Sequence, residues 1–253
     1  MTATSCNSWV ISPKTNPNAR LRLFCFPYAG CGASIFRPLV DDFPAAIEVC
    51  LVQLPGRESR LQETLFTRLG ALLPTLAEAI HPYLNMPFAF FGHSMGALIA
   101  FELARQLGRQ YNLSPVHLFV SGRRAPQLPN LKSPIHQLPQ AGLIEELRAL
   151  DGTPQTVLQN PDLMRLVLPI IRADFALCET YVYSSEALLD CPISAFGGWQ
   201  DKEASPSALA AWRNQTNNCF VLRMFSGNHF FLHAARLPIV SAVSQDLRQL
   251  CIS

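Results

Sequence analysis

The sequence predicts an α/β protein with a mostly parallel central sheet and helices on both faces. Short apolar runs, typical of buried strands, alternate along the chain with longer segments whose apolar residues recur at helical intervals. This alternation favours parallel strands joined by crossover helices. The predicted strands are 21–28, 48–54, 88–92, 117–121, 192–197 and 220–225, and the predicted helices are 64–84, 97–108, 205–213 and 229–250.

Pro74 lies inside the first predicted helix. It is expected to kink or split the segment 64–84, because proline lacks the amide that continues a helix. The chain of 253 residues suits one domain of this class, and it contains no internal repeat or low-complexity tract. We therefore expect a single domain over 1–253.

One long insertion interrupts the alternation. About 70 residues separate the strand that ends near 121 from the strand that begins near 192. This stretch begins rich in proline and continues with helix-like segments at 142–150 and 161–181. We predict a helical lid insertion at about 126–190. Its apolar side chains are candidates for lining a chamber beneath the lid or for packing the lid onto the core: Leu147, Leu150, Val157, Leu158, Leu166, Val167, Leu168 and Ile171.

The composition argues against several classes of partner. Hydrophobic residues make up 49% of the chain and charged residues 15%, so a large core can be buried. A net charge of +2 predicts no nucleic-acid partner and no other strongly electrostatic partner. The cysteines lack the CxxC spacing of zinc and redox sites, so no metal is expected. A monomer without a cofactor is the simplest expectation.

The eight cysteines are expected to be free thiols rather than disulfides. Cys25, Cys50 and Cys219 lie in apolar strand-like runs, where a free cysteine behaves as a small hydrophobic side chain. The N-terminal segment lacks the basic and apolar regions of a signal peptide. The longest charge-poor stretch, 87–101, is too short and too polar to span a bilayer. These features predict a cytoplasmic protein that does not contact a membrane.

Ser94 lies at a predicted strand-to-helix turn, at the centre of the motif GHSMG (92–96). Such a turn is strained and holds the hydroxyl above the sheet, while the two glycines make room for crossing backbones. The following helix N-terminus places N–H groups near developing negative charge. An ordinary β–α turn of small residues is the alternative interpretation. Ser94 is the candidate nucleophile, and His93 is expected to be structural.

A nucleophilic serine needs a base, and the base needs an orienting acid. When a serine occupies such a turn, the acid and then the histidine follow it in the chain, each after a strand. His229 lies in the loop after the last predicted strand, and His233 is the weaker alternative one helical turn later. Asp201 is the first carboxylate after the preceding strand, with Glu203 as the alternative. Helix capping is the competing role for Asp201, although Ser205 suits that role better.

Two backbone amides are candidates for an oxyanion hole. One is the N–H of Met95, directly after the nucleophile. The other is the N–H of Ala29, in the small-residue loop after the first long strand, where the backbone can approach a reacting carbonyl. A plain glycine turn is the alternative interpretation of that loop.

Four motifs in a fixed order make the sequence similar to one family. They are FPYAG (26–30), LPGRExR (54–60), GHSMG (92–96) and GNHFF (227–231). Together they resemble the type II thioesterases, stand-alone partners of non-ribosomal peptide and polyketide synthases. The resemblance covers about residues 20 to 250, which is nearly the whole chain.

This resemblance implies an α/β-hydrolase fold with a helical lid. It also implies hydrolysis of acyl thioesters held on the 4′-phosphopantetheine arm of carrier proteins, which removes stalled or wrong acyl groups. The implied roles are nucleophile for Ser94, base for His229, acid for Asp201, and oxyanion donors for Met95 and Ala29. The acyl-carrier or peptidyl-carrier protein is the implied partner.

The sequence departs from the family pattern at two positions. Asn228 precedes the histidine where the family often has aspartate, which alters the local charge but not the triad. Cys31 stands where the family often has glycine, in the loop of the proposed oxyanion donor.

Further positions have open roles. Arg57, Glu58 and Arg60 are marked by the resemblance, either as a salt-bridged loop or as a contact for pantetheine. Tyr28, Arg57 and Phe230 are candidates for the vicinity of the substrate or of its pantetheine arm.

Three other functions compete with this one. A medium-chain fatty acyl carrier-protein thioesterase has the same fold and triad. An ordinary carboxylesterase would prefer oxygen esters to thioesters. A docking module without activity belongs to a different class, and the intact Ser94, Asp201 and His229 argue against it.

Overall fold

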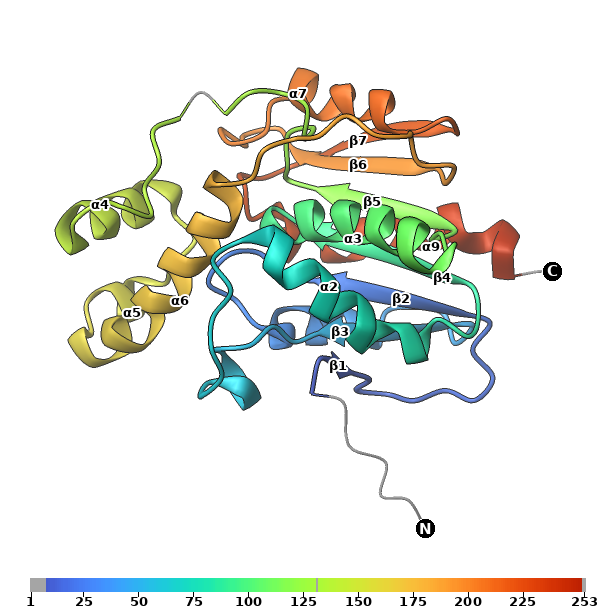
Figure 1. The fold of residues 1–253 in the computed structure, drawn as a ribbon, viewed down its shortest axis with the longest axis horizontal. Helices are drawn as coiled ribbons and strands as arrows, with labels where there is room; N and C mark the ends of the chain where they lie inside the picture. The colour runs from blue at the N-terminus through green and yellow to red at the C-terminus, as the bar shows by residue number, and fades with distance from the viewer. Residues whose placement is uncertain (1–7, 131, 252–253) are drawn as a thin grey trace, which may run out of the picture.

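The computed structural model describes residues 8–130 and 132–251, with side chains up to 248. This part of the chain forms a seven-stranded sheet flanked by helices (Figure 1). In order across the sheet, the strands are β1 (Val10–Ile11), β3 (Ile47–Val52), β2 (Leu21–Phe26), β4 (Phe88–His93), β5 (His117–Ser121), β6 (Ile193–Gly198) and β7 (Phe220–Phe225).

The pairing of the strands confirms a mostly parallel sheet. Every neighbouring pair is parallel except β1 and β3, which are antiparallel. The six predicted strands are all present, with ends shifted by a few residues. The sequence analysis missed β1, because a strand of two residues is too short to show a hydrophobic period.

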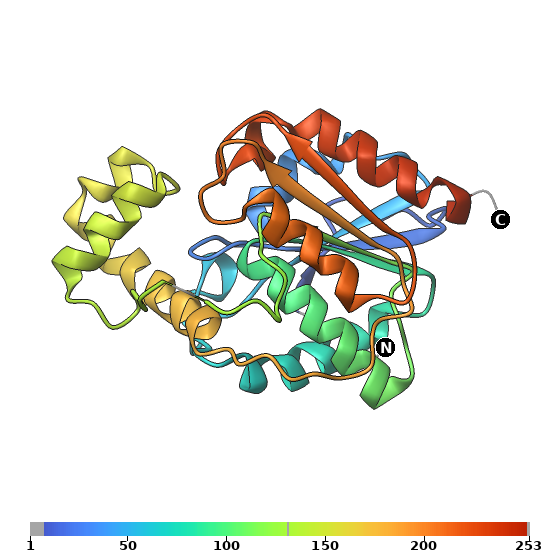
Figure 2. The ribbon, with the colours of Figure 1, turned by 90° about the horizontal axis from the view of Figure 1, so that it is seen from above.

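Helices cover both faces of the sheet (Figure 2). One face packs on α2 (Leu69–Ile80), α3 (Met95–Tyr111) and α7 (Pro206–Ala210). The other packs on α1 (Arg37–Val40), α8 (Phe231–Ala234) and α9 (Arg236–Cys251). Two separate hydrophobic clusters result, because successive strand residues point to opposite faces.

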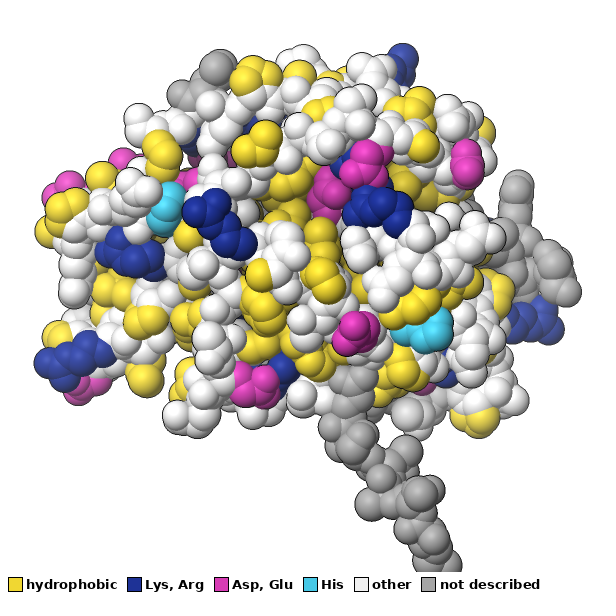
Figure 3. Space-filling model, in the orientation of Figure 1, with side chains coloured by type: hydrophobic (Ala, Val, Ile, Leu, Met, Phe, Trp, Pro, Cys, Tyr) yellow, Lys and Arg dark blue, Asp and Glu magenta, His cyan; other side chains and the backbone are white. Residues whose placement is uncertain are grey.

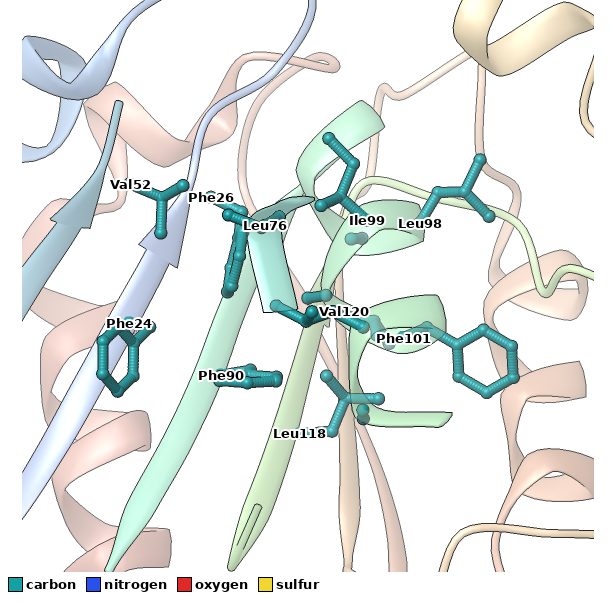
Figure 4. Packing of buried hydrophobic residues seen from close by; sticks show 14 of the residues in the cluster. Phe24, Phe26, Val52, Leu76, Phe90, Leu98, Ile99, Phe101, Leu118 and Val120 are labelled. Carbon is teal, nitrogen blue, oxygen red and sulfur yellow. The ribbon is translucent and has the colours of Figure 1, made fainter. Parts of the chain in front are cut away.

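The cluster beneath α3 is dense in aromatic side chains (Figure 4). Phe24 and Phe90 meet edge to face, with ring centroids 5.9 Å apart. Full burial of one such side chain is worth about 1.5–3 kcal/mol, so this layer holds the α3 helix firmly on the sheet. The side chains labelled in the figure are Phe24, Phe26, Val52, Leu76, Phe90, Leu98, Ile99, Phe101, Leu118 and Val120.

The predicted helix 64–84 is shorter than expected. It begins at Leu69, because Leu65 covers the turn at Gly56, where an added Cβ would lie 2.2 Å from the leucine side chain. Pro74 neither splits nor ends the helix. It lies on the solvent side, where water can hydrate the carbonyl that loses its partner.

The predicted helix 229–250 is two helices, α8 and α9, separated at Ala235. Pro238 explains the break, because it cannot donate to the carbonyl of Ala234 and so cannot continue α8. Proline is tolerated in the first turn of the new helix, where its amide needs no partner.

Three helices of the insertion lie beyond the carboxyl ends of the parallel strands (Figures 1 and 2). They are α4 (Gln140–Leu150), α5 (Gln155–Leu158) and α6 (Pro161–Glu179). Asn160 begins α6 by accepting hydrogen bonds from two amides of its first turn. The helices share a small hydrophobic cluster of their own, which includes Leu143, Leu158 and Leu168.

The surface carries charges of both signs. On the face seen in Figure 3, acidic and basic side chains are interspersed among hydrophobic ones. None of the helices within 8–130 and 132–251 is long and apolar enough to cross a bilayer.

Candidate active site

Ser94 occupies a strained turn between β4 and α3, as the motif predicts. Its backbone has φ 52° and ψ −111°, a conformation that costs a non-glycine residue energy. The two glycines permit the turn: a Cβ on Gly92 would lie 2.2 Å from the Gly96 carbonyl oxygen, and one on Gly96 would lie 2.0 Å from the Phe26 carbonyl oxygen. The Ser94 amide donates to the carbonyl of Ser121 at 2.7 Å, which fixes the turn on the sheet.

His229 and Asp201 lie together at the same end of the sheet. His229 Nδ1 is 3.0 Å from Asp201 Oδ2, and the aspartate side chain is fully buried. Asp201 Oδ1 accepts hydrogen bonds from the amides of Glu203 and Ala204, so the carboxylate is held on both oxygens. This pairing leaves the other ring nitrogen of His229, Nε2, available to a serine.

The alternative residues are engaged elsewhere. His233 Nε2 lies 3.1 Å from the Tyr28 hydroxyl. Glu203 forms an ion pair with Lys132 at 2.5 Å. Ser205 caps α7 by accepting a hydrogen bond from the amide of Ala208, which is the capping role expected for it.

His93 lies buried behind the candidate base. Its Nδ1 is 2.9 Å from Ser121 Oγ, and its ring centroid is 5.3 Å from that of His229. Burial is the main reason that the pKa of His93 is well below its usual value, and the neighbouring His229 adds to the effect. His93 is therefore neutral and packs against the ring of His229, which agrees with the structural role expected for it.

The loop that bears Ala29 touches the turn that bears Met95. The carbonyls of Phe26 and Pro27, at the end of β2, lie against Gly96 with no room for a Cβ. Ala29, Met95, Ser94 and His229 all line one cavity. The two candidate oxyanion donors and the candidate nucleophile therefore share one site.

That cavity has a volume of about 560 Å³ and lies between the sheet and the insertion. Of the side chains predicted as candidates for it, Leu147, Leu150, Val157, Val167 and Ile171 line it. Leu158 and Leu168 pack inside the insertion instead, and Leu166 is 54% exposed. Lining residues that the sequence analysis missed include Phe175, Arg123 and Arg124.

Two residues placed near the substrate, Tyr28 and Phe230, line the cavity with their rings 5.3 Å apart. Phe230 also meets the insertion, because a Cβ on Gly152 would lie 2.0 Å from its ring. Cys31 lines the same cavity, but burial raises the pKa of its thiol to about 11. A protonated thiol is a poor nucleophile, so Cys31 does not compete with the serine.

Arg57 lies one layer behind the cavity. It is 4% exposed, and its guanidinium group makes two hydrogen bonds to Asp174 of α6. Glu58 accepts hydrogen bonds from Ser34, and Arg60 donates to the carbonyl of Gln53. The charged side chains of the motif 54–60 are therefore all hydrogen-bonded to other groups of the protein. Asp174 was missed by the sequence analysis, which singled out no residue of α6 other than its apolar ones.

A second group of serine, histidine and aspartate lies near the amino ends of β5 and β6, at the other end of the parallel strands. His117 Nε2 is 3.0 Å from Ser194 Oγ, which is 2.7 Å from Asp246 Oδ2. Arg223 binds Asp246 with two hydrogen bonds. Within the described residues, no cluster of three or more histidine, cysteine or acidic side chains is arranged to hold a metal ion.

Comparison with known proteins identifies the family of this chain. The family model named "Thioesterase domain" matches residues 21–247. The chain belongs to this thioesterase family. The gramicidin S biosynthesis protein GrsT of Aneurinibacillus migulanus is 48% identical over 242 residues, which cover 96% of this chain and 94% of GrsT.

A solved structure and a more distant relative agree with this membership. RedJ, a thioesterase from the prodiginine pathway of Streptomyces coelicolor, superimposes with a TM-score of 0.87 at 37% identity, covering 94% of this chain and 95% of RedJ. The medium-chain S-acyl fatty acid synthase thioesterase of Rattus norvegicus is 32% identical, covering 86% of this chain and 83% of that protein. These likenesses confirm the α/β-hydrolase fold and place the chain among hydrolases that act on thioesters.

Proposed function

We propose that this thioesterase hydrolyses acyl groups from the 4′-phosphopantetheine arm of carrier proteins of non-ribosomal peptide or polyketide synthases, by way of an acyl-Ser94 intermediate. The observation that carries the proposal is one cavity that brings together Ser94, His229 and the backbone of Ala29 and Met95. The 48% identity to a gramicidin S biosynthesis protein, against 32% to the medium-chain enzyme, favours the synthase pathway.

The first half of the reaction acylates the serine. His229 Nε2 takes the proton of the Ser94 hydroxyl as the oxygen attacks the thioester carbonyl. The N–H groups of Met95 and Ala29 stabilise the negative oxygen of the tetrahedral intermediate. The intermediate collapses, the C–S bond breaks, and His229 returns the proton to the departing pantetheine thiolate. Asp201 holds the imidazole in the required tautomer and stabilises its charged form.

The second half releases the acid. His229 removes a proton from a water molecule, which attacks the acyl carbonyl of the ester on Ser94. A second tetrahedral intermediate forms in the same oxyanion hole, and its collapse breaks the bond to Ser94 and frees the carboxylic acid. The protonated His229 restores the serine hydroxyl. Apart from the substrate and one water molecule, these steps use only groups of the protein.

The helices between β5 and β6 suit a lid over this site. We propose that the segment 126–190 moves to admit the pantetheine arm, since such lids gate access in other enzymes. The aromatic rings of Tyr28 and Phe230 border the channel in this proposal. Lid residues would then exchange amide hydrogens faster than the sheet, and an acyl-loaded carrier would slow that exchange. Equal exchange in lid and sheet, unchanged by carrier, would contradict the lid motion.

The cysteines bear on the compartment in which the protein works. Six described cysteines are free thiols, which suits a reducing compartment such as the cytoplasm. We propose a cytoplasmic monomer whose macromolecular partner is the carrier protein.

Turnover of defined carriers tests the proposal. Carrier proteins loaded with acetyl or decanoyl groups are incubated with the wild-type chain and with Ser94→Ala, and the remaining acyl-carrier is measured by intact mass. Loss of the acyl mass with wild type but not with the variant supports the proposal. Hydrolysis of decanoyl-carrier alone would favour the medium-chain function, and faster hydrolysis of a matched oxygen ester would favour a carboxylesterase.

A further inference from the structure

Asp174 is a buried carboxylate of α6 whose partners lie outside the insertion. Its side chain is 2% exposed. Asp174 Oδ2 accepts hydrogen bonds from the Gly30 amide at 2.7 Å and from Arg57 Nη1 at 2.6 Å, and Oδ1 accepts one from Arg57 Nη2 at 2.8 Å. Charge-assisted bonds of this kind are short and strong, particularly when they are removed from water.

The Gly30 amide belongs to the peptide that directly follows Ala29. Cys31 N donates to the Tyr28 carbonyl at 3.2 Å, and Gly30 has φ 81°, which together describe a tight turn with Ala29 and Gly30 at its centre. The Asp174 bond fixes the plane of the central peptide of this turn. Because neighbouring peptide planes share the Cα of Ala29, the direction of the Ala29 N–H depends on that plane.

Arg57 fixes the same turn at its other end. Besides pairing with Asp174, its guanidinium group donates to the Cys31 carbonyl at 3.2 Å and to the Pro55 carbonyl at 3.2 Å. Four guanidinium hydrogen bonds therefore join α6, the turn 28–31 and the motif 54–60. A planar fork of donors suits this arrangement, which a lysine ammonium group cannot reproduce.

Gln53 and Glu58 hold the rest of the loop. Gln53 Oε1 accepts a hydrogen bond from the Ala33 amide, and its Nε2 donates to the Arg57 carbonyl. Glu58 accepts from the amide and hydroxyl of Ser34. The segment that follows the turn is thereby fixed as well, while Arg57 and Asp174 bind the turn itself.

We propose that Asp174 and Arg57 are positioning residues that orient the Ala29 N–H in the oxyanion hole. They act through the Gly30 amide and the Cys31 carbonyl and do not touch the substrate. The proposal rests on the proposed function, because it assigns these residues to the stabilisation of the same tetrahedral intermediate. It also connects helix α6 of the insertion, through the turn 28–31, to the stabilisation of the oxyanion.

The proposal predicts which kinetic constant changes. An oxyanion donor acts on the transition state and hardly on the bound substrate, so its displacement lowers kcat while KM stays nearly constant. Loss of one such donor costs about 10²–10³-fold in kcat, and a displaced donor is expected to cost about 10–100-fold.

The experiment compares Asp174→Ala and Arg57→Lys with wild type on an acyl-loaded carrier. A fluorophosphonate probe that reacts with the nucleophile counts the folded active sites, so rates are expressed per site. We expect kcat to fall about 10–100-fold for Asp174→Ala and less for Arg57→Lys, with KM within about threefold. The affinity for an acyl trifluoromethyl ketone, whose adduct places an oxyanion in the hole, should fall by a similar factor.

A charge-swapped pair separates positioning from simple ion pairing. Arg57→Asp with Asp174→Arg restores opposite charges but leaves the Gly30 amide facing a cation. The swap is expected to recover the melting temperature lost in Asp174→Ala without recovering kcat. Full recovery of kcat would show that only the ion pair matters and would overturn the proposal.

Asp246→Asn is the matched control, because it removes the carboxylate from another bidentate arginine pair, with Arg223, outside the cavity. It should lower stability and leave kcat per site unchanged. Wild-type kcat per site and unchanged ketone affinity in Asp174→Ala would overturn the positioning role alone. A wild-type chain that does not hydrolyse any acyl-carrier would instead overturn the proposed function.

Discussion

Two groups of serine, histidine and aspartate lie toward opposite ends of the parallel strands, and their geometries differ. Ser94, His229 and Asp201 follow the carboxyl ends of β4, β7 and β6, whereas His117 and Ser194 lie near the amino ends of β5 and β6. The first group opens on a cavity of about 560 Å³. In the second, Ser194 is 0% exposed and donates to Asp246, so its hydroxyl proton is already committed to a carboxylate.

The difference shows that residue types alone do not make a triad. In the first group His229 Nδ1 lies 3.0 Å from the carboxylate of Asp201, and Ser94, held on a strained turn, lines the same cavity as His229. In the second group the serine lies between histidine and aspartate, and Arg223 neutralises the carboxylate. Burial is the main reason that the pKa of His117 falls to about 4, so this imidazole is too weak a base near neutral pH.

The largest expected contrast is between the two serines. Ser94→Ala should lower kcat on an acyl-loaded carrier by at least about 10⁴-fold, since removal of the nucleophile leaves only the oxyanion hole and binding. Ser194→Ala should keep kcat within about twofold, because Ser194 does not touch the cavity. Release of the pantetheine thiol, followed with a thiol reagent, measures both. A strong loss in Ser194→Ala at full active-site count would break the contrast.

The two aspartates give the next contrast. Asp201→Asn should lower kcat about 10³–10⁴-fold, because the amide favours the wrong tautomer of His229. The melting temperature should change little, since the shape of the side chain is kept. Single-turnover rates of the two asparagine variants, Asp201→Asn and Asp246→Asn, measured side by side provide the test. Similar rates in both would contradict the assignment of the acid.

Asp246→Asn should act on stability. Burial, the largest single effect, raises the pKa of this carboxyl, but the hydrogen bonds from Arg223 and Ser194 and nearby positive charge together lower it, so the charged form is preferred in the fold. Its loss leaves Arg223, 26% exposed, without its anion, at an expected cost of about 2–3 kcal/mol. The midpoint of urea unfolding measures this cost. An unchanged midpoint would show that solvent replaces the pair without loss.

An effect on stability of similar size should depend on pH. The pKa of His117 is about 4 in the fold against 6.5 ordinarily, so between these values the unfolded chain binds more protons than the folded one. Stability should therefore fall as pH drops from about 6.5 to about 4, by on the order of 2–3 kcal/mol from this residue.

His117→Gln should flatten that dependence, as urea unfolding at a series of pH values would show. His93, whose pKa is also lowered, contributes with the same sign, so part of the slope should remain. A variant with the wild-type slope would contradict the assignment to His117.

Much of the fold and site was predictable because the signals are local. Each of the strands β2 to β7 appears in the sequence as a run of apolar residues. The candidate serine, aspartate and histidine each follow one of these strands, which is where the active-site residues of an α/β-hydrolase fold lie. The parallel sheet then fixes which edge those loops share. The chain order of Ser94, Asp201 and His229 gives the roles we propose for them.

The rest depended on contacts between distant residues. Arg57 and Asp174 are 117 positions apart, and neither carries a local pattern that reveals its partner. The start of α2 was predicted too early in the chain, because Leu65 packs on the turn at Gly56 and does not belong to the helix. The break between α8 and α9 does have a local cause in Pro238, which the sequence analysis did not weigh.

Mapping of a covalent adduct tests the central claim most directly. The wild-type chain, Ser94→Ala and Ser194→Ala are treated with a fluorophosphonate and digested, and the modified peptide is sequenced by mass spectrometry. We predict one adduct, on Ser94, in the wild type and in Ser194→Ala, and none in Ser94→Ala. An adduct on another residue of the wild type, or an adduct that persists in Ser94→Ala, would contradict Ser94 as the nucleophile.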